Sequence, residues 1–246
     1  MRSLLVILLS SVSWLVVAQE PLSPEERFRT DPVRVGLSFS FDLTDRELGS
    51  ENGDRIANTI LDPGSAHSSR VGFSAGLDLM IPLDDRLSLM TGARYVDMGF
   101  RSRAVVDTLL VEETILEDRE VFQAYHFQYL KLPLALHLQL GTGSFRTTFM
   151  AGVHVGYLAG VYRVYYDEQP EGRNPTERLD GLHNFDHLNL FPMAEVGLLH
   201  RTTSRIWTHA GINGRYGVLP VTDRPVSTAL WSAGITLGVF YSFRTP

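Results

Sequence analysis

Eight ionisable residues that recur at alternate positions of apolar segments are the strongest candidates for a functional site. Alternate side chains of an extended strand point to the same side of a sheet, so these charges would gather inside if the sheet closes on itself. Charges removed from water must be paired or hydrated, which predicts a ladder of ion pairs and bound waters. This lumen charge cluster consists of Arg34, Asp42, Asp78, Arg94, Lys131, Arg146, Glu195 and Arg215.

Other chemically capable residues give weaker signals. His183, Asp186 and His187 have a spacing that binds metal on a helix, but they lie in a polar connection, where we expect solvated side chains. The acidic run Glu112–Glu120 could bind divalent cations, yet such runs are usually solvated. Barrels that act on lipid acyl chains place a nucleophile and a base at the lipid rim, and the apolar faces carry no such set. We therefore predict no catalytic residues, metal or cofactor.

The elements that would position the charges are eight segments in which apolar residues alternate with small or polar ones. The clearest is Ala229–Phe243, where eight apolar side chains share one face and the other face is mostly Gly, Ser and Thr. Connections between segments are alternately long and short, as in outer-membrane barrels. We therefore predict an all-β fold, an eight-stranded antiparallel up-and-down transmembrane β-barrel over residues 33–246. The segments are Val33–Asp42, Arg70–Ile81, Leu87–Gly99, Ala124–Leu140, Phe145–Val161, His187–Leu199, Arg205–Tyr216 and Ala229–Phe243.

A soluble lipocalin-like fold is the rival interpretation. Its solvated face should be rich in Lys, Glu, Gln and Thr, whereas the polar face of this chain is dominated by glycine. Glycine weakens strands, and a narrow eight-stranded barrel supplies a steric reason for it, because the interior is just wide enough to be filled by side chains. We expect the inward glycines to make room for the bases. They are Gly36, Gly72, Gly76, Gly92, Gly152, Gly156, Gly211 and Gly234.

Aromatic residues predict two girdles at the membrane interfaces. Phe41, Tyr95, Tyr157, Tyr216 and Trp231 fall near the ends with long connections, and Phe145, Trp207, Tyr241 and Phe243 fall near the short turns. Two irregularities are expected within the strands. The alternation loses phase near Asp97, which marks a bulge or the membrane rim, and Pro192 removes a ladder donor and marks a bulge.

The start of the chain predicts export. Arg2 is followed by the apolar run Leu4–Leu9 and by small residues up to Ala18, the order found in a signal peptide. We predict a cleaved signal peptide over 1–18, a flexible periplasmic segment over 19–32, and localisation in the cell outer membrane. The net charge of −6 argues against nucleic acid as a partner.

The stretch Tyr129–Leu134 resembles the Tyr-Leu-Glu-Ile-Pro-Leu strand of the PorT-like outer membrane protein beta-barrel domain family of Bacteroidota, also described as porin family proteins. Leu89–Gly99 and Tyr216–Leu219 are similar to that family's third strand and last outer loop. The resemblance implies fold, compartment and bacterial group, and carries over no catalytic or ligand residues. Lys131 stands where the family usually has an acid.

Three functions are consistent with these features. The first is a barrel with an occluded or very narrow lumen, acting as a structural or accessory subunit of an envelope assembly. The second is a small passive porin that favours anions, and the third, a minor alternative, is a lipid-modifying enzyme. Expected partners are outer-membrane lipid and lipopolysaccharide, the barrel assembly machinery during insertion, and other envelope proteins.

Overall fold

The computed structural model describes residues 32–49, 67–103, 110–111, 114–115, 122–141, 143–166, 176–179, 185–221 and 227–243. The predicted signal peptide, nearly all of the predicted periplasmic segment, and His183 lie outside these residues. Among the described residues, no helix is long and apolar enough to cross a membrane.

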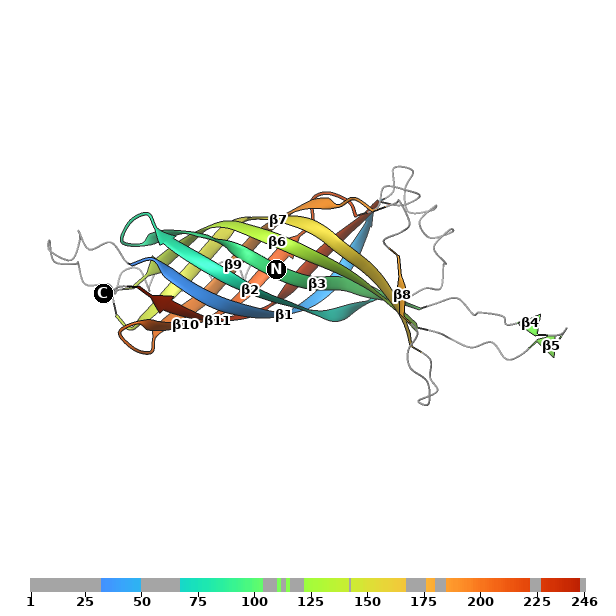
Figure 1. Cartoon of the computed structure of the whole chain (residues 1–246), viewed down its shortest axis with the longest axis horizontal. Coiled ribbons are helices and arrows are strands. Elements are labelled where there is room, and N and C mark those ends of the chain that lie inside the picture. Colours follow the sequence, from blue (N-terminus) through green and yellow to red (C-terminus); the bar gives the residue numbers. More distant parts are fainter. Residues whose placement is uncertain are drawn as a thin grey trace, which may run out of the picture.

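Within the described ranges, eight long strands close into a barrel (Figure 1). Each pairs antiparallel with its neighbour along the chain, and the last pairs with the first, so the predicted eight-stranded antiparallel β-barrel is confirmed. The strands are β1 (Arg34–Gly49), β2 (His67–Pro82), β3 (Leu87–Arg103), β6 (Phe122–Leu140), β7 (Phe145–Tyr166), β9 (Leu188–Arg201), β10 (Ile206–Tyr216) and β11 (Ser227–Ser242).

Several strands run beyond the segments that alternation predicted, mainly at the end with long connections. β1 continues to Gly49 and β7 to Tyr166. Backbone pairing needs no apolar side chains, so it persists past the band where apolar residues alternate with polar ones. Three short strands also lie within connections that were predicted to be loops, namely β4 (Leu110–Val111), β5 (Thr114–Ile115) and β8 (Thr176–Arg178).

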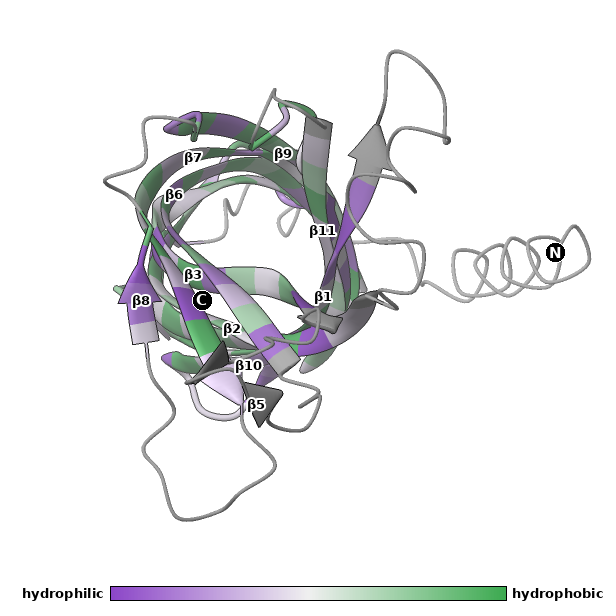
Figure 2. Cartoon of the chain, turned by 90° about the vertical axis from the view of Figure 1, so that its right-hand side faces the viewer, coloured by the Kyte–Doolittle hydropathy of each residue, from purple (hydrophilic) through white to green (hydrophobic). Residues whose placement is uncertain are grey.

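Hydrophobic and hydrophilic residues alternate along the strands of the barrel (Figure 2). The burial of alternate residues divides the wall into an apolar outer face and a mixed inner face. β9 alternates exposed and buried residues from Leu188 through Leu199 without a break. Outward residues such as Val71 and Ile212 remain 69% and 71% exposed in the isolated chain. An apolar surface of this kind requires an apolar surrounding medium.

A bulge is present near Asp97, but the extra residue is on the neighbouring strand. Ser69 of β2 pairs with Phe100, and Phe73 pairs with Asp97, so β2 supplies three intervening residues against two from β3. The prediction at Pro192 is wrong, because β7–β9 pairing passes through Val153–Pro192 without a shift. β9 pairs with β10 only from Met193 onward, so Pro192 lies just past the end of that ladder.

A second bulge was not predicted, and it reverses the phase of β7. Gln128 pairs with Gly160 and Tyr129 with Leu158, which leaves Ala159 without a partner in β6. As a consequence Val161, predicted to face outward, is fully buried. Ala159 and Val161 continue the apolar alternation of the preceding residues, so the sequence gives no sign that Ala159 is an inserted residue.

Glycines allow the closest approaches inside the wall. A Cβ atom on Gly76 would lie 2.3 Å from Cγ of Arg94, so this glycine makes room for a base as expected. At Gly36 and Gly156, however, the neighbouring group is the ring of Phe240 or Phe191. The inward glycines therefore accommodate aromatic rings as well as guanidinium groups.

We predict that Gly152→Ala destabilises the barrel, because its Cβ would lie 2.3 Å from the Leu134 carbonyl oxygen and 2.4 Å from Ala135 Cα. Overpacking of this kind should lower the free energy of unfolding by about 1–3 kcal/mol. Gly214→Ala is the matched control, since nothing lies within 4 Å of its Cβ position. Urea unfolding in lipid vesicles, followed by heat-dependent gel migration, measures both variants. Equal midpoints would contradict the steric explanation.

Candidate functional site

The eight residues of the lumen charge cluster project inward from seven strands. Seven of them are at most 4% exposed, and Arg146 is half-buried. Because each occupies the inward phase of its strand, closure of the barrel brings together residues that lie up to 181 positions apart in sequence, from Arg34 to Arg215. The structure thus places all eight on the inside of the wall.

Two ion pairs hold the centre of the lumen. Arg94 donates to both oxygens of Asp78, from Nε to Oδ1 at 2.9 Å and from Nη2 to Oδ2 at 2.7 Å. Arg215 Nη1 lies 3.2 Å from Asp42 Oδ2. The first pair is bidentate, the arrangement that best matches a guanidinium to a carboxylate.

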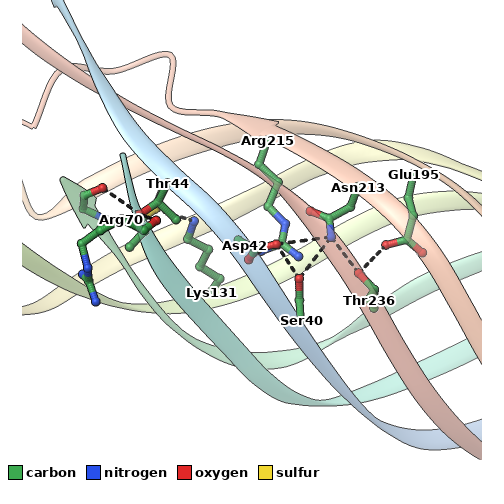
Figure 3. Close-up of polar contacts among 11 residues, drawn as sticks. Ser40, Asp42, Thr44, Arg70, Lys131, Glu195, Asn213, Arg215 and Thr236 are labelled. Carbon is green, nitrogen blue, oxygen red and sulfur yellow. Dashed lines mark hydrogen bonds and ion pairs between the residues drawn. The ribbon is translucent and has the colours of Figure 1, made fainter. Parts of the chain in front are cut away.

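A chain of neutral side chains links the second ion pair to Glu195 (Figure 3). Asn213 Nδ2 donates to Ser40 Oγ at 3.1 Å and to Thr236 Oγ1 at 2.9 Å. Thr236 in turn donates to Glu195 Oε2 at 2.9 Å. On its other oxygen, Glu195 lies 3.3 Å from Nε2 of His209. These contacts run along the inner face of the wall and tie together four strands that are consecutive in the barrel, β1, β11, β10 and β9.

The lumen near the short turns is filled by an aromatic ring between two bases. The guanidinium carbons of Arg34 and Arg146 lie 4.2 Å and 4.9 Å from the centre of the Trp207 ring. Both arginines also donate to Gln139 Oε1, at 3.2 Å and 3.1 Å. The placement of Trp207 in an interfacial girdle was wrong, because the side chain is fully buried. Trp207 lies two residues before His209 in β10, so the two-residue repeat of a strand places both side chains on the inner face. That repeat could have predicted the inward position of Trp207.

The opposite end of the barrel contains an apolar cluster, here called the apolar plug, which was not predicted. Its members come from the barrel wall and from two connections, through Leu179 and Val221. Tyr125 and Phe185 pack against it. The plug consists of Val96, Met98, Phe100, Phe127, Tyr129, Leu158, Val161, Leu179, Phe191, Val221 and Leu230.

Two further polar clusters beside the plug were missed. Asp97 accepts hydrogen bonds from Nη1 and Nη2 of Arg70 at 2.9 Å and 3.0 Å, and lies 3.0 Å from Nδ1 of His126. Beyond the barrel end, Arg163 and Tyr165 of β7 bind Glu177 of β8. Hydrogen bonds from Arg163 and then Tyr165 lower the pKa of the Glu177 carboxyl. These contacts join connections to the wall, which local sequence patterns do not reveal.

Little space remains beside the central ion pair of Arg94 and Asp78. A cavity of about 10 Å³ is bordered by Asp78, Arg94, Glu195 and His209, among others. This volume is close to the minimum that one water molecule requires.

The predicted membrane-interface aromatics lie on the outer face. Phe41, Tyr157, Tyr241 and Phe243 are exposed, whereas Tyr95 and Trp231 are half-buried.

The expectation that His183, Asp186 and His187 are solvated side chains and do not form a metal site stays a prediction, because His183 lies outside the described residues. Asp186 and His187 are exposed, and the His187 ring stacks on Tyr157. Among the described residues, no group of three or more His, Asp or Glu side chains is arranged to hold a metal ion.

We predict that Asp78→Asn lowers the free energy of unfolding by about 3–5 kcal/mol, because it leaves the buried Arg94 without its counter-charge. The double variant Asp78→Asn, Arg94→Met removes both charges and should lose less. Unfolding of each barrel in urea gives the comparison. If the double variant is as unstable as the single one or more so, the charge pairing is not the cause.

Several solved barrels resemble this structure. Neisserial surface protein A is 10% identical, with 86% of this chain and 97% of that chain covered and a TM-score of 0.42. OprG of Pseudomonas aeruginosa is 14% identical, with 88% and 98% covered and a TM-score of 0.41. The outer membrane protease OmpT of Escherichia coli is 12% identical, with 91% and 99% covered and a TM-score of 0.40.

No curated protein matches the sequence. The sequence model of a family described as outer membrane protein beta-barrel domain, however, matches residues 18–245. This match spans almost the entire chain and agrees with the closed, outwardly apolar barrel. The protein therefore belongs to the outer membrane protein beta-barrel domain family.

Proposed function

We propose that this outer-membrane barrel does not conduct solutes and acts as a structural or accessory subunit of an envelope assembly. The observation that carries the proposal is the filling of the lumen at three levels. Trp207 and two arginines occupy the end with short turns, ion pairs occupy the centre, and the apolar plug occupies the other end. A filled interior leaves the outer wall and the connections as the surfaces available for partners.

The packing weighs against the porin alternative. A passive porin needs a continuous water-filled path, whereas the cavity beside Arg94 is about the size of one water molecule. Much of the predicted excess of positive charge is also neutralised, because Arg94 and Arg215 each have a carboxylate partner.

Among the described residues, the enzyme alternative is represented by a contact of Thr148 with His209 and Glu195, whose geometry is unsuitable. Thr148 Oγ1 lies 3.4 Å from His209, which also contacts Glu195 at 3.3 Å. A relay from nucleophile to base to acid uses both ring nitrogens of the histidine. Here both contacts are made by Nε2, and all three side chains are buried. We therefore favour a barrel that is not an enzyme.

An ordered polar extension at the long-connection end supports a docking role. Residues 176–178 of β8 pair with residues 162–164 of β7, and Glu177 is held by Arg163 and Tyr165. Such a surface offers other envelope proteins, or lipopolysaccharide, a preformed set of charges.

The finer identity that we propose is a PorT-like protein of Bacteroidota, exported by a signal peptide cleaved before Gln19 and inserted by the barrel assembly machinery. It rests on the resemblance of residues 129–134 and on the basic, apolar and small segments that precede Gln19.

Planar bilayer recording tests the occluded lumen. We expect no discrete conductance steps from the refolded wild-type protein, because side chains fill the lumen at three levels. The variant Trp207→Gly, Phe191→Gly removes one large side chain from each end and serves as the comparison for leakage. An open porin reconstituted in parallel verifies the assay. Wild-type steps of uniform size that favour anions would overturn the proposal and establish the porin alternative.

Copurification in mild detergent after crosslinking in cells tests the accessory role. We expect stoichiometric envelope proteins with the wild type. Fewer are expected with a variant in which residues 104–121 are replaced by a short turn. Heat-dependent migration must confirm that this variant is a folded barrel. Recovery of the wild-type barrel alone, under conditions that preserve known envelope complexes, contradicts the role.

A further inference from the structure

The barrel wall has one local interruption between β3 and β6. Thr91 pairs with Leu134 and Arg94 pairs with Lys131, but the two residue positions between them on each strand are unpaired. The register is the same on both sides, so the strands remain aligned. Pro133 lies in this interruption and has no backbone N–H to donate. We call this unpaired stretch, residues 92–93 and 132–133, the seam.

The seam is confined to one strand pair. Gly92 still pairs with Asp78 of β2, and Pro133 still pairs with His154 of β7. At this level of the barrel, the pairing of β3 with β2 and of β6 with β7 is thus intact, and the interruption lies where β3 meets β6. Local opening of a sheet requires least free energy where backbone hydrogen bonds are missing.

A groove of about 440 Å³ lies over the seam. Its volume is in the range of small-molecule sites. Gly92, Ala93 and Leu132 of the seam border it. The groove continues between outward apolar side chains from β6, β7 and β9, which are Leu130, Val155, Tyr157 and Leu188. A groove with these borders fits a hydrocarbon chain supplied from the membrane.

Two basic residues, Arg94 and Lys131, also border the groove. Lys131 is 2% exposed, and its Nζ atom lies 3.4 Å from Met98 Sδ and 3.2 Å from the centre of the Phe191 ring. Among the described residues, no carboxylate lies within ion-pairing distance of this ammonium group. It stands outside the hydrogen-bonded chain that joins Asp42 to Glu195 (Figure 3).

Arg94 adds an unused donor at the same place. Its Nε and Nη2 atoms bind Asp78, but Nη1 is buried and has no hydrogen-bond partner among the described residues. A buried ammonium without a counter-ion and an unsatisfied guanidinium N–H are both unfavourable. One small anion placed between them would relieve both.

We propose that the groove binds a long-chain monocarboxylate from the membrane, with its chain along the outer wall and its carboxylate at Lys131 and Arg94 Nη1. The seam spans two residue positions, about 7 Å along the strand, so the anionic group that passes it must be compact. A carboxylate at the end of one unbranched chain meets this requirement, whereas a two-chain phospholipid carries its charge on a bulky head group. The site goes beyond the proposed structural role and does not require a conducting lumen.

Displacement of a fluorescent fatty acid, 11-(dansylamino)undecanoate, from the full-length barrel in nanodiscs tests this site, with empty nanodiscs as background. We expect saturable binding that hexadecanoate displaces and that hexadecanol, which lacks the charge, does not. Lys131→Met should weaken binding roughly tenfold or more, as expected for loss of a charge-assisted contact. Lys131→Arg should retain it. Equal displacement by the acid and the alcohol would overturn the proposal.

Two wall variants keep the test independent of the folding of Lys131→Met. Leu132→Trp fills the groove from its outer side and should abolish saturable binding, while Gly214→Ala, on the outer face of β10, should leave it unchanged. Heat-dependent migration verifies that each variant is folded. Undiminished binding by folded Leu132→Trp excludes the groove. Displacement by phosphatidic acid at the same concentration as hexadecanoate excludes the preference for a single-chain carboxylate.

Discussion

Closure of eight strands into one narrow barrel is the constraint on which the other features depend. Closure pairs the edges of the sheet, so that the backbone can satisfy its own hydrogen bonds inside a membrane. It also makes the interior so narrow that inward side chains from opposite strands touch. Most inward residues are therefore small, apolar, or matched with a partner.

The arrangement of the lumen follows from that narrowness. Bases and acids from neighbouring strands meet on the inner face, as Arg94 of β3 meets Asp78 of β2. Neutral side chains such as Asn213 connect Asp42 to Glu195. Glycines remove volume where a neighbouring ring or guanidinium group must pass, as at Gly36 and Gly76. With Trp207 at one end and the apolar plug at the other, the interior resembles a packed core.

Because the interior is packed, a place where the backbone pairing between two strands is interrupted is of particular interest. The seam beside Pro133 is such a departure, because the two strands keep their register while the ladder between them is interrupted. Behind it lies Lys131, a buried base without a described carboxylate partner. In a barrel whose lumen is filled, a ligand that reaches this base has a more direct route through the wall than along the axis.

The sequence alone was sufficient for strand number, antiparallel order, turn ends and the inward charges, because two-residue alternation is a local property. The two-residue repeat also indicates that Trp207 faces inward. The general preference of aromatic residues for membrane interfaces led instead to the prediction that it lies in a girdle. Other features needed the tertiary structure. The unpaired Ala159 turns Val161 inward only through the register between β6 and β7. The partner of each charge depends on which strands lie close together in the closed barrel, as β10 and β1 do for Arg215 and Asp42. The apolar plug includes Leu179 and Val221, which lie in connections outside the eight long strands. These contacts join residues distant in sequence, so no local pattern encodes them.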